Sequence, residues 1–226
     1  MSSLTQSALA AMIDHTLLKP EATRAEIEKL CAEAKQYGFV SVCVQPYRTA
    51  LAAELLKDSS VKVCTVIGFP FGANRAEIKA LEAVRAVADG ALELDMVLNI
   101  GAIKDGNWSL IATEIEAIVK AARERVVKVI LETALLTDAE IVKACEVSRD
   151  AGALYVKTST GYSKHGATIE AVQLMKKTVG EDMGVKASGG IRDRSTLLKM
   201  YEAGANRIGT SHGVAIMTDS SGHGDY

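Results

Sequence analysis

The chain alternates between two hydrophobic patterns along almost its whole length. Segments with apolar residues at helical spacing are separated by short runs rich in Val, Ile, Leu and Cys, which are typical of buried strands. The first pattern predicts helices over 23–38, 73–89, 108–123, 137–152, 168–178 and 194–203, and a short final helix at GVAIMT. The second predicts eight strands: MIDHT, VSVCV, VKVCTVI, ALELDMV, VVKVILE, ALYVKT, GVKAS and RIGT.

Signals at the helix ends agree with this assignment. TRAE and TDAE each place a threonine three residues before a glutamate, which is the spacing of a capping box. Both of these helices end at a glycine, Gly38 or Gly152. Eight strand–helix units favour a closed (β/α)₈ barrel of the TIM type, one domain over 1–226, rather than an open doubly wound sheet. The ending DSSGHGDY, 219–226, is predicted to be a flexible tail.

A weak internal repeat supports the barrel. DGALELD, AGALYVK and AGANRIG each end a helix at a glycine, usually Gly-Ala, and then begin a strand. The fifth residue after the glycine is Asp95, Lys157 or Gly209, and Cys43 holds the same offset after Gly38. We therefore expect these four residues at similar depths along their strands. In such barrels the C-terminal strand ends carry the chemistry.

Composition narrows the class of protein. The chain has 226 residues, 48% of them hydrophobic and 24% charged, with a formal net charge of -2, which is ordinary globular composition. The near-neutral balance gives no reason to expect nucleic acid or an anionic membrane as a partner. We expect neither a membrane span nor a signal peptide, and the four cysteines show no CxxC spacing. A cytoplasmic protein with reduced thiols is expected.

Charged residues inside the predicted strands are the main chemical signal. Lys157 and Lys186 interrupt apolar runs, and a buried lysine costs several kcal/mol unless it is compensated. Asp95 lies on the face of its strand opposite the leucines, so it is expected to point into the barrel. The same alternation predicts that Lys128 and Glu132 point inward. These charges form either a catalytic site or an ion-pair network that only holds the barrel together.

The catalytic alternative has a definite chemistry. An inward lysine that is desolvated beside a second lysine is expected to have a lowered pKa. A neutral amine forms a Schiff base with a carbonyl carbon, and a carboxylate such as Asp95 can then move protons with the second lysine. This set predicts aldolase chemistry of class I, without a cofactor, but it does not choose between Lys157 and Lys186. The histidines have neither HxH nor HExxH spacing, so no metal site is predicted.

Two glycine-rich turns supply a possible anion site. ASGGIR and IGTSHG both follow late strands, and backbone N–H groups in such turns bind phosphate. Arg192 would add positive charge. The glycines of either turn alone could equally serve only to let the chain turn, whereas the two turns together favour a phosphate-binding site. Cys43 is expected near the site, although a buried cysteine usually only packs.

The motifs VKTSTGY, VKASGGIR and LELDMVLNIG resemble those of the deoxyribose-phosphate aldolase family. SVCVQP, VIGFPFGAN, VKVILET and RIGTS extend the resemblance over nearly all of the chain from IDHTLLKP onward. It implies a (β/α)₈ class I aldolase that reversibly cleaves 2-deoxy-D-ribose 5-phosphate into acetaldehyde and D-glyceraldehyde 3-phosphate. It further implies small-molecule aldehyde and sugar-phosphate substrates, no cofactor, and a homodimer or homotetramer.

The resemblance also assigns roles to residues. It makes Lys157 the Schiff-base lysine and Asp95 with Lys186 the proton-relay pair. Phosphate recognition would carry over to Gly161, Gly189, Gly190, Arg192, Gly209 and Ser211.

Three positions qualify the resemblance. Tyr162 stands where some members have a lysine, and His212 stands where many have a second serine. Both differences lie in the loops that the resemblance assigns to phosphate binding. A C-terminal tyrosine assists proton transfer in some members, and Tyr226 is in a matching place.

Two other functions fit the same sequence. One is a related Schiff-base aldolase or transaldolase that uses a different pair of aldehydes. The other is a non-catalytic barrel that binds sugar phosphates as a sensor, which would be expected to lack a lysine or the aspartate of the site.

Overall fold

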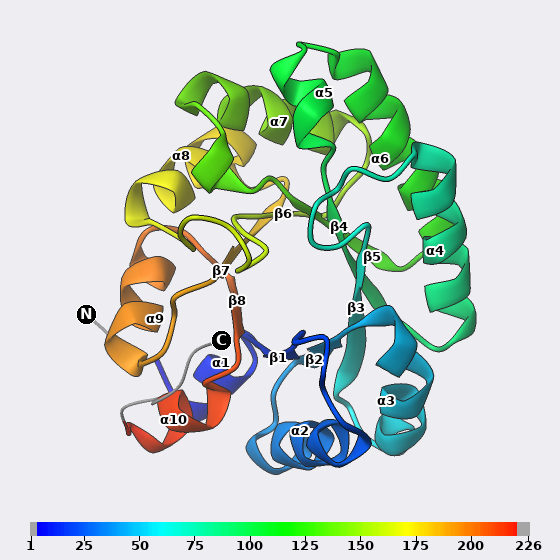
Figure 1. The fold of residues 1–226 in the computed structure, drawn as a ribbon. Coiled ribbons are helices and arrows are strands. Elements are labelled where there is room, and N and C mark those ends of the chain that lie inside the picture. The colour runs from blue at the N-terminus through cyan, green and yellow to red at the C-terminus, as the bar shows by residue number, and fades with distance from the viewer. Residues whose placement is uncertain (1–3, 221–226) are drawn as a thin grey trace.

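The computed structural model describes residues 4–220 and confirms the closed barrel (Figure 1). Eight parallel strands pair in chain order, and the last pairs with the first to close the sheet. Every predicted strand is present within a few residues of its expected position. The strands are β1 Ile13–Leu17, β2 Ser41–Val44, β3 Lys62–Ile67, β4 Glu93–Val97, β5 Val126–Ile130, β6 Tyr155–Lys157, β7 Gly184–Ser188 and β8 Arg207–Thr210.

Helices form the outer layer around the strands (Figure 1). The predicted helices are confirmed as α2 Arg24–Tyr37, α4 Ala76–Ala88, α6 Trp108–Ala122, α7 Asp138–Asp150, α8 Ile169–Val179, α9 Arg194–Glu202 and the short α10 Gly213–Thr218. Periodicity did not reveal the shorter elements, which are α1 Gln6–Ala10, α3 Thr49–Leu56, α5 Ile100–Lys104 and the 3-10 turns η1 Pro46–Arg48 and η2 Thr133–Leu135.

Both predicted capping boxes form. The Thr23 side chain accepts from the Glu26 N–H, and the Glu26 carboxylate accepts from the Thr23 N–H. Thr137 and Glu140 make the same reciprocal pair at the start of α7. These bonds satisfy donors that a helix N-terminus leaves unpaired, which is why both helices begin where the sequence indicates.

The repeated glycine turn is one structural unit used four times. Its glycine has a φ of 71° at Gly38, 97° at Gly90, 87° at Gly152 and 112° at Gly204, a region that favours glycine. In each copy the next N–H donates to the carbonyl five residues earlier, which closes the preceding helix. The fifth residue after the glycine is consequently the third residue of β2, β4, β6 and β8: Cys43, Asp95, Lys157 and Gly209.

The apolar core lies between the strands and the helices, and the barrel interior is charged. In β4, Leu94 and Met96 pack into the apolar core, while Glu93 and Asp95 are buried on the opposite face. Lys128 and Lys186 are likewise fully buried. The sequence-based expectation that the polar face of β4 points inward is therefore confirmed.

The C-terminal end of the described chain is held to α10. Asp219 is the C-cap of this helix, and the Ser220 N–H donates to the Ala215 carbonyl. Residues 221–226, with Tyr226, lie outside the described residues, so the predictions for the tail and for this tyrosine stay predictions. None of the helices within 4–220 combines the length and apolarity needed to cross a membrane.

Candidate active site

Asp95 is the centre of the charged cluster inside the barrel. Its Oδ2 accepts from Lys157 Nζ at 2.8 Å and from Lys186 Nζ at 2.7 Å. Its Oδ1 accepts from Lys128 Nζ at 2.8 Å. Lys157 is 2% exposed and the other three residues are fully buried. The structure thus places both lysines singled out for catalysis in contact with Asp95, and the prediction that Lys128 points inward is confirmed as well.

Further charges lie nearer the N-terminal ends of the strands. Asp14 contacts Lys186 and also accepts from Arg207 Nη1 at 2.8 Å. Glu93 lies 2.6 Å from Lys128 Nζ and 2.8 Å from Arg207 Nη1. Sequence reasoning did not include Asp14 or Arg207 in the site. The signal was available, because each is a charged residue within an apolar strand.

The charges stabilise one another against the cost of burial. Burial alone would raise the pKa of Asp95, but Lys128, Lys157 and Lys186 hold it well below its usual range. Burial would lower the pKa of Lys186, but Asp14 and Asp95 raise it above its ordinary value. The pKa of Lys128 is raised in the same way. The expectation that an inward lysine beside another has a lowered pKa is therefore wrong for Lys186 and Lys128, because it ignored the carboxylates between them.

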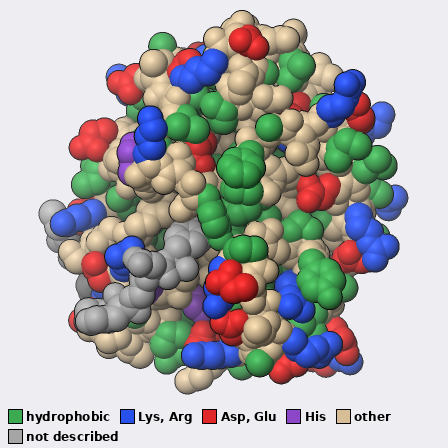
Figure 2. Space-filling model, viewed as in Figure 1, with side chains coloured by type: hydrophobic (Ala, Val, Ile, Leu, Met, Phe, Trp, Pro, Cys, Tyr) green, Lys and Arg blue, Asp and Glu red, His purple; other side chains and the backbone are tan. Residues whose placement is uncertain are grey.

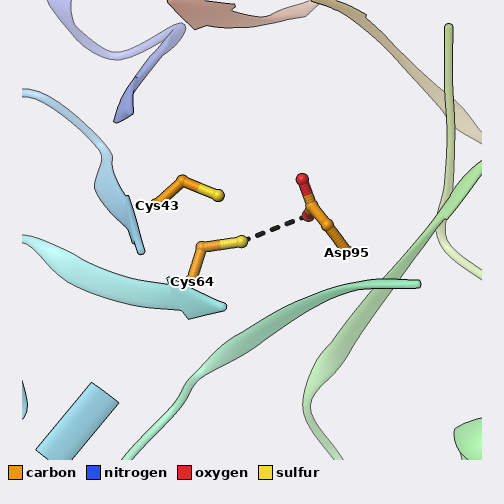
Figure 3. A group of neighbouring side chains, drawn as sticks. All are labelled: Cys43, Cys64 and Asp95. Atoms are coloured by element: carbon orange, nitrogen blue, oxygen red, sulfur yellow. Dashed lines mark hydrogen bonds between the residues drawn. The ribbon is translucent and has the colours of Figure 1, made fainter. Parts of the chain in front are cut away.

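Two thiols border the carboxylate. Figure 3 shows Cys43, Cys64 and Asp95 converging inside the barrel, with the Cys64 thiol donating to Asp95 Oδ1 at 3.1 Å. Their ligand atoms lie within 4.8 Å of one another, which is a possible metal-ligand spacing. A cation here would have to compete with three ammonium groups for Asp95. The neighbouring Cys64 thiol lowers the pKa of Cys43, so Cys43 is the more easily ionised of the two.

Gly209 makes room for one of the lysines. A Cβ at this position would lie 3.0 Å from Lys186 Cε and 3.0 Å from Ser188 Cβ. A side chain there would force Lys186 or Ser188 to shift by a few tenths of an ångström. The glycine predicted to bind phosphate through its backbone therefore has a second, steric reason to be there.

The two glycine-rich turns come together after β7 and β8. They enclose a small cavity of about 20 Å³. Gly161, also predicted at the phosphate end, does not line it, although its Cα would be 3.7 Å from a Cβ built on Gly189. The cavity is lined by Gly189, Gly190, Ile191, Arg192, Gly209, Thr210, Ser211 and His212.

Glu132 does not follow the alternation expected of it. Strand β5 ends at Ile130, and Glu132 has a φ of 56°, so the strand geometry has already stopped. Its carboxylate instead accepts from the side chain and the N–H of Thr160 in the loop after β6. Burial raises the pKa of Glu132. The residue joins two loops at the barrel mouth rather than the charged cluster.

The chain belongs to the DeoC/LacD family of aldolases, whose model matches residues 8–219. It is 59% identical to the deoxyribose-phosphate aldolase of Streptococcus suis strain 98HAH33, over 95% of this chain and 97% of that protein. It is 58% identical to the enzyme of the same name from Geobacillus sp. strain WCH70, over 96% and 98%. The solved deoxyribose phosphate aldolase of Aeropyrum pernix, described as a tetramer, superposes with a TM-score of 0.89 at 38% identity, covering 95% of this chain and 91% of that one.

Proposed function

We propose that this chain is a class I aldolase that reversibly cleaves 2-deoxy-D-ribose 5-phosphate into acetaldehyde and D-glyceraldehyde 3-phosphate. One observation carries the proposal: Nζ of Lys157 and Nζ of Lys186 share one oxygen of Asp95, at 2.8 and 2.7 Å, inside a closed barrel. The names of the similar proteins identify the substrate. A sensor barrel would be expected to have lost part of this set, and all of it is present.

The contacts of the lysines support different roles for them. Among the described residues Lys128 contacts three carboxylates, Lys186 contacts two, and Lys157 contacts only Asp95. A lysine between several carboxylates is held as a cation, which suits proton transfer and charge stabilisation rather than attack on a carbonyl. Lys157 is also the last residue of β6, nearest the barrel mouth. These features favour Lys157 as the nucleophile.

The proposed reaction has four steps. The Lys157 amine attacks C1 of the open-chain sugar, and loss of water leaves an iminium. Removal of the proton on the C3 hydroxyl breaks the C2–C3 bond, whose electron pair forms an enamine with the iminium, and the phosphorylated three-carbon aldehyde leaves. Protonation of the enamine at C2 gives the imine of acetaldehyde. Water then hydrolyses this imine and restores the amine.

The proton transfers are assigned to Asp95 and Lys186. Asp95 is in contact with both lysines, and a proton given up at one side of the pair can be returned at the other. Lys128 fixes the second oxygen of Asp95 and so orients the carboxylate. The phosphate is assigned to the turns after β7 and β8, whose small cavity is lined by Arg192 and by glycines of the kind that bind anions through their backbone N–H groups.

Borohydride trapping tests the proposal, since reduction fixes an imine onto the lysine that formed it. The protein is incubated with deoxyribose 5-phosphate, or with acetaldehyde alone, then reduced and mapped by peptide mass spectrometry. We expect a substrate-dependent adduct on Lys157. Lys157→Leu should abolish trapping, whereas Asp95→Asn should slow turnover and leave some trapping. An adduct on Lys186 would reverse the two roles, and full activity of Lys157→Leu would overturn the assignment.

We also propose that the chain self-associates through α4. Ile78, Leu81 and Val84 form a stripe at helical spacing on this helix and are 49%, 64% and 53% exposed. A contiguous apolar stripe on a surface helix is typical of an interface. The Aeropyrum pernix relative is described as a tetramer. Light scattering on the purified protein tests this, and a monomer at all concentrations would contradict it.

A further inference from the structure

Lys157, the proposed nucleophile, lies below the loops at the barrel mouth. Lys157 is only 2% exposed, and the loop residues that follow it, Thr158 to Thr160, are equally buried. Leu18, Cys43, Cys64 and Val66 form an apolar cluster beside the charged site, and Phe69 packs onto this cluster. Figure 2 shows hydrophobic side chains gathered near the centre of the face seen in Figure 1. A sugar phosphate reaches Lys157 only if part of this cover moves.

Tyr162 joins the loops that form the cover. Its hydroxyl donates to the Leu18 carbonyl oxygen at 2.9 Å, a contact between residues 144 positions apart in the sequence. Its ring meets the Phe69 ring edge-on, with centroids 5.5 Å apart and an interplanar angle of 90°. One side chain on the β6 loop therefore holds the segments after β1 and β3 together above the site.

Several features indicate that this cover can open. Tyr162 is 43% exposed, so its ring is at the surface rather than in the core. The contact across the mouth includes one neutral hydrogen bond, which contributes little net stability. A cavity of about 200 Å³ lies beside the ring, lined by Pro70, Phe71, Ile100, Glu132, Leu135, Thr160, Tyr162 and Ser163, and gives the side chain space to move.

We propose that Tyr162 is a latch that closes the barrel mouth over Lys157 and must release the Leu18 carbonyl before a sugar phosphate can enter. Tyr162 is thus a positioning residue, which acts through the loops. The significance of the latch for catalysis rests on the proposed function. With the latch closed, bulk water is kept from the imine, so that the bound intermediate goes forward to bond cleavage rather than back to hydrolysis.

The thiols beneath the latch report its opening independently of catalysis. Cys43 and Cys64 are fully buried in the cluster that contains Leu18, so a thiol reagent reaches them only when the mouth opens. Cys43 is the more reactive of the two, because its pKa is lowered. Cys31 on α2 and Cys145 on α7 are fully buried outside the barrel and serve as internal controls.

The experiment measures alkylation of each cysteine by iodoacetamide, with the sites resolved by mass spectrometry, in the protein without substrate. Tyr162→Phe keeps the ring and removes the hydroxyl, and we expect it to speed alkylation of Cys43 about fivefold, the effect of one lost hydrogen bond on a local opening. Tyr162→Ala should speed it further. Cys31 and Cys145 should keep their wild-type rates. Tyr201→Phe, a substitution of a comparably exposed tyrosine on α9, should change none of them.

The outcomes separate the latch from the function. An unchanged rate at Cys43 in both Tyr162 variants overturns the latch, and so does equal acceleration at all four cysteines, which would report general destabilisation. If the protein forms no imine yet Tyr162→Phe exposes Cys43 selectively, the latch stands and the proposed function fails. Where the imine does form, borohydride should reduce the acetaldehyde adduct about fivefold faster in Tyr162→Phe than in the wild type.

Discussion

Two groups of buried charges lie on opposite sides of strand β4. Inside the barrel, Asp95 contacts three lysines. Outside it, Lys79 of α4 lies 2.7 Å from Glu114 of α6, and both residues are fully buried. Lys79 Nζ also donates to the Val97 carbonyl at 2.8 Å, and the Asn99 N–H donates to Glu114 at 3.3 Å. Both groups thus place lysine ammonium groups 2.7–2.8 Å from a buried carboxylate.

Their pKa values shift in opposite directions. In the outer pair, burial raises the pKa of Glu114 and lowers that of Lys79, so desolvation outweighs the ion pair between them, even with the charge of Glu82 acting on Lys79 as well. In the barrel the pKa of Asp95 falls and that of Lys186 rises, because each has several partners of opposite charge. The comparison teaches that the number of partners decides whether a buried charge is stabilised. A network can hold a lysine charged where an isolated pair pulls both groups towards neutrality.

The most severe test removes one member of the network. Asp14→Asn leaves Lys186 and Arg207 each with one fewer carboxylate, and we expect unfolding stability to fall by about 3–5 kcal/mol. Turnover should also fall by roughly tenfold or more, because Lys186 loses the carboxylate on its far side. Urea denaturation and steady-state kinetics measure the two effects. If stability and turnover both stay at wild-type values, Asp14 is not part of the network that holds Lys186.

The outer pair should behave differently. Glu114→Gln removes the only ion-pair partner of Lys79 within the described chain, and we expect a loss of about 1–3 kcal/mol with turnover within about twofold of wild type. The double variant Lys79→Met/Glu114→Leu should be about 1 kcal/mol more stable than Glu114→Gln, because no buried charge is left unpaired. A double variant no more stable than Glu114→Gln would show that the outer pair is stabilising after all, and would remove the contrast with the barrel.

The smallest expected effect is a difference in the sign of a pH dependence. The pKa of Asp14 is lowered in the folded state, because Lys186, Lys128 and Arg207 outweigh burial. The contribution of Asp14 to the free energy of unfolding is therefore fully present above its pKa in the unfolded chain, about 3.9, and is lost as the pH falls below that value. The pKa of Glu114 is raised, so its contribution becomes less favourable as pH rises above about 4.3.

Unfolding measured between pH 3 and pH 6 separates the two signs. The stability of the wild type relative to Asp14→Asn should increase with pH, and its stability relative to Glu114→Gln should decrease, each by about 1 kcal/mol. If the two stability differences changed with pH in the same direction, the number of charged partners would not govern the direction of the pKa shifts.

The helical period and the strand alternation of apolar residues were enough to predict the barrel, the long helices and the inward face of β4. They also led to Asp95 and to both lysines, because a charge in an apolar strand has to be compensated. Alternation failed at Glu132, where a positive φ ends the strand geometry. The pKa of Lys186 was predicted in the wrong direction because the position of Asp14 depends on the pairing of β1 with β8, which only barrel closure establishes. The contact between Tyr162 and Leu18 joins residues 144 positions apart, so no local pattern in the sequence indicates it.

Because of the four glycine turns, the residues of the site are divided between the two halves of the chain, so activity can report whether the halves have associated. The turns set Cys43, Asp95, Lys157 and Gly209 at the same position on alternate strands, so one layer of the barrel draws a residue from each quarter of the chain. A fragment ending after β4 carries the carboxylate without its lysines, and the complementary fragment carries the lysines without the carboxylate. Two such fragments expressed separately would be inert, and aldol activity on mixing them would report that β4 had found β5 and β8 had found β1.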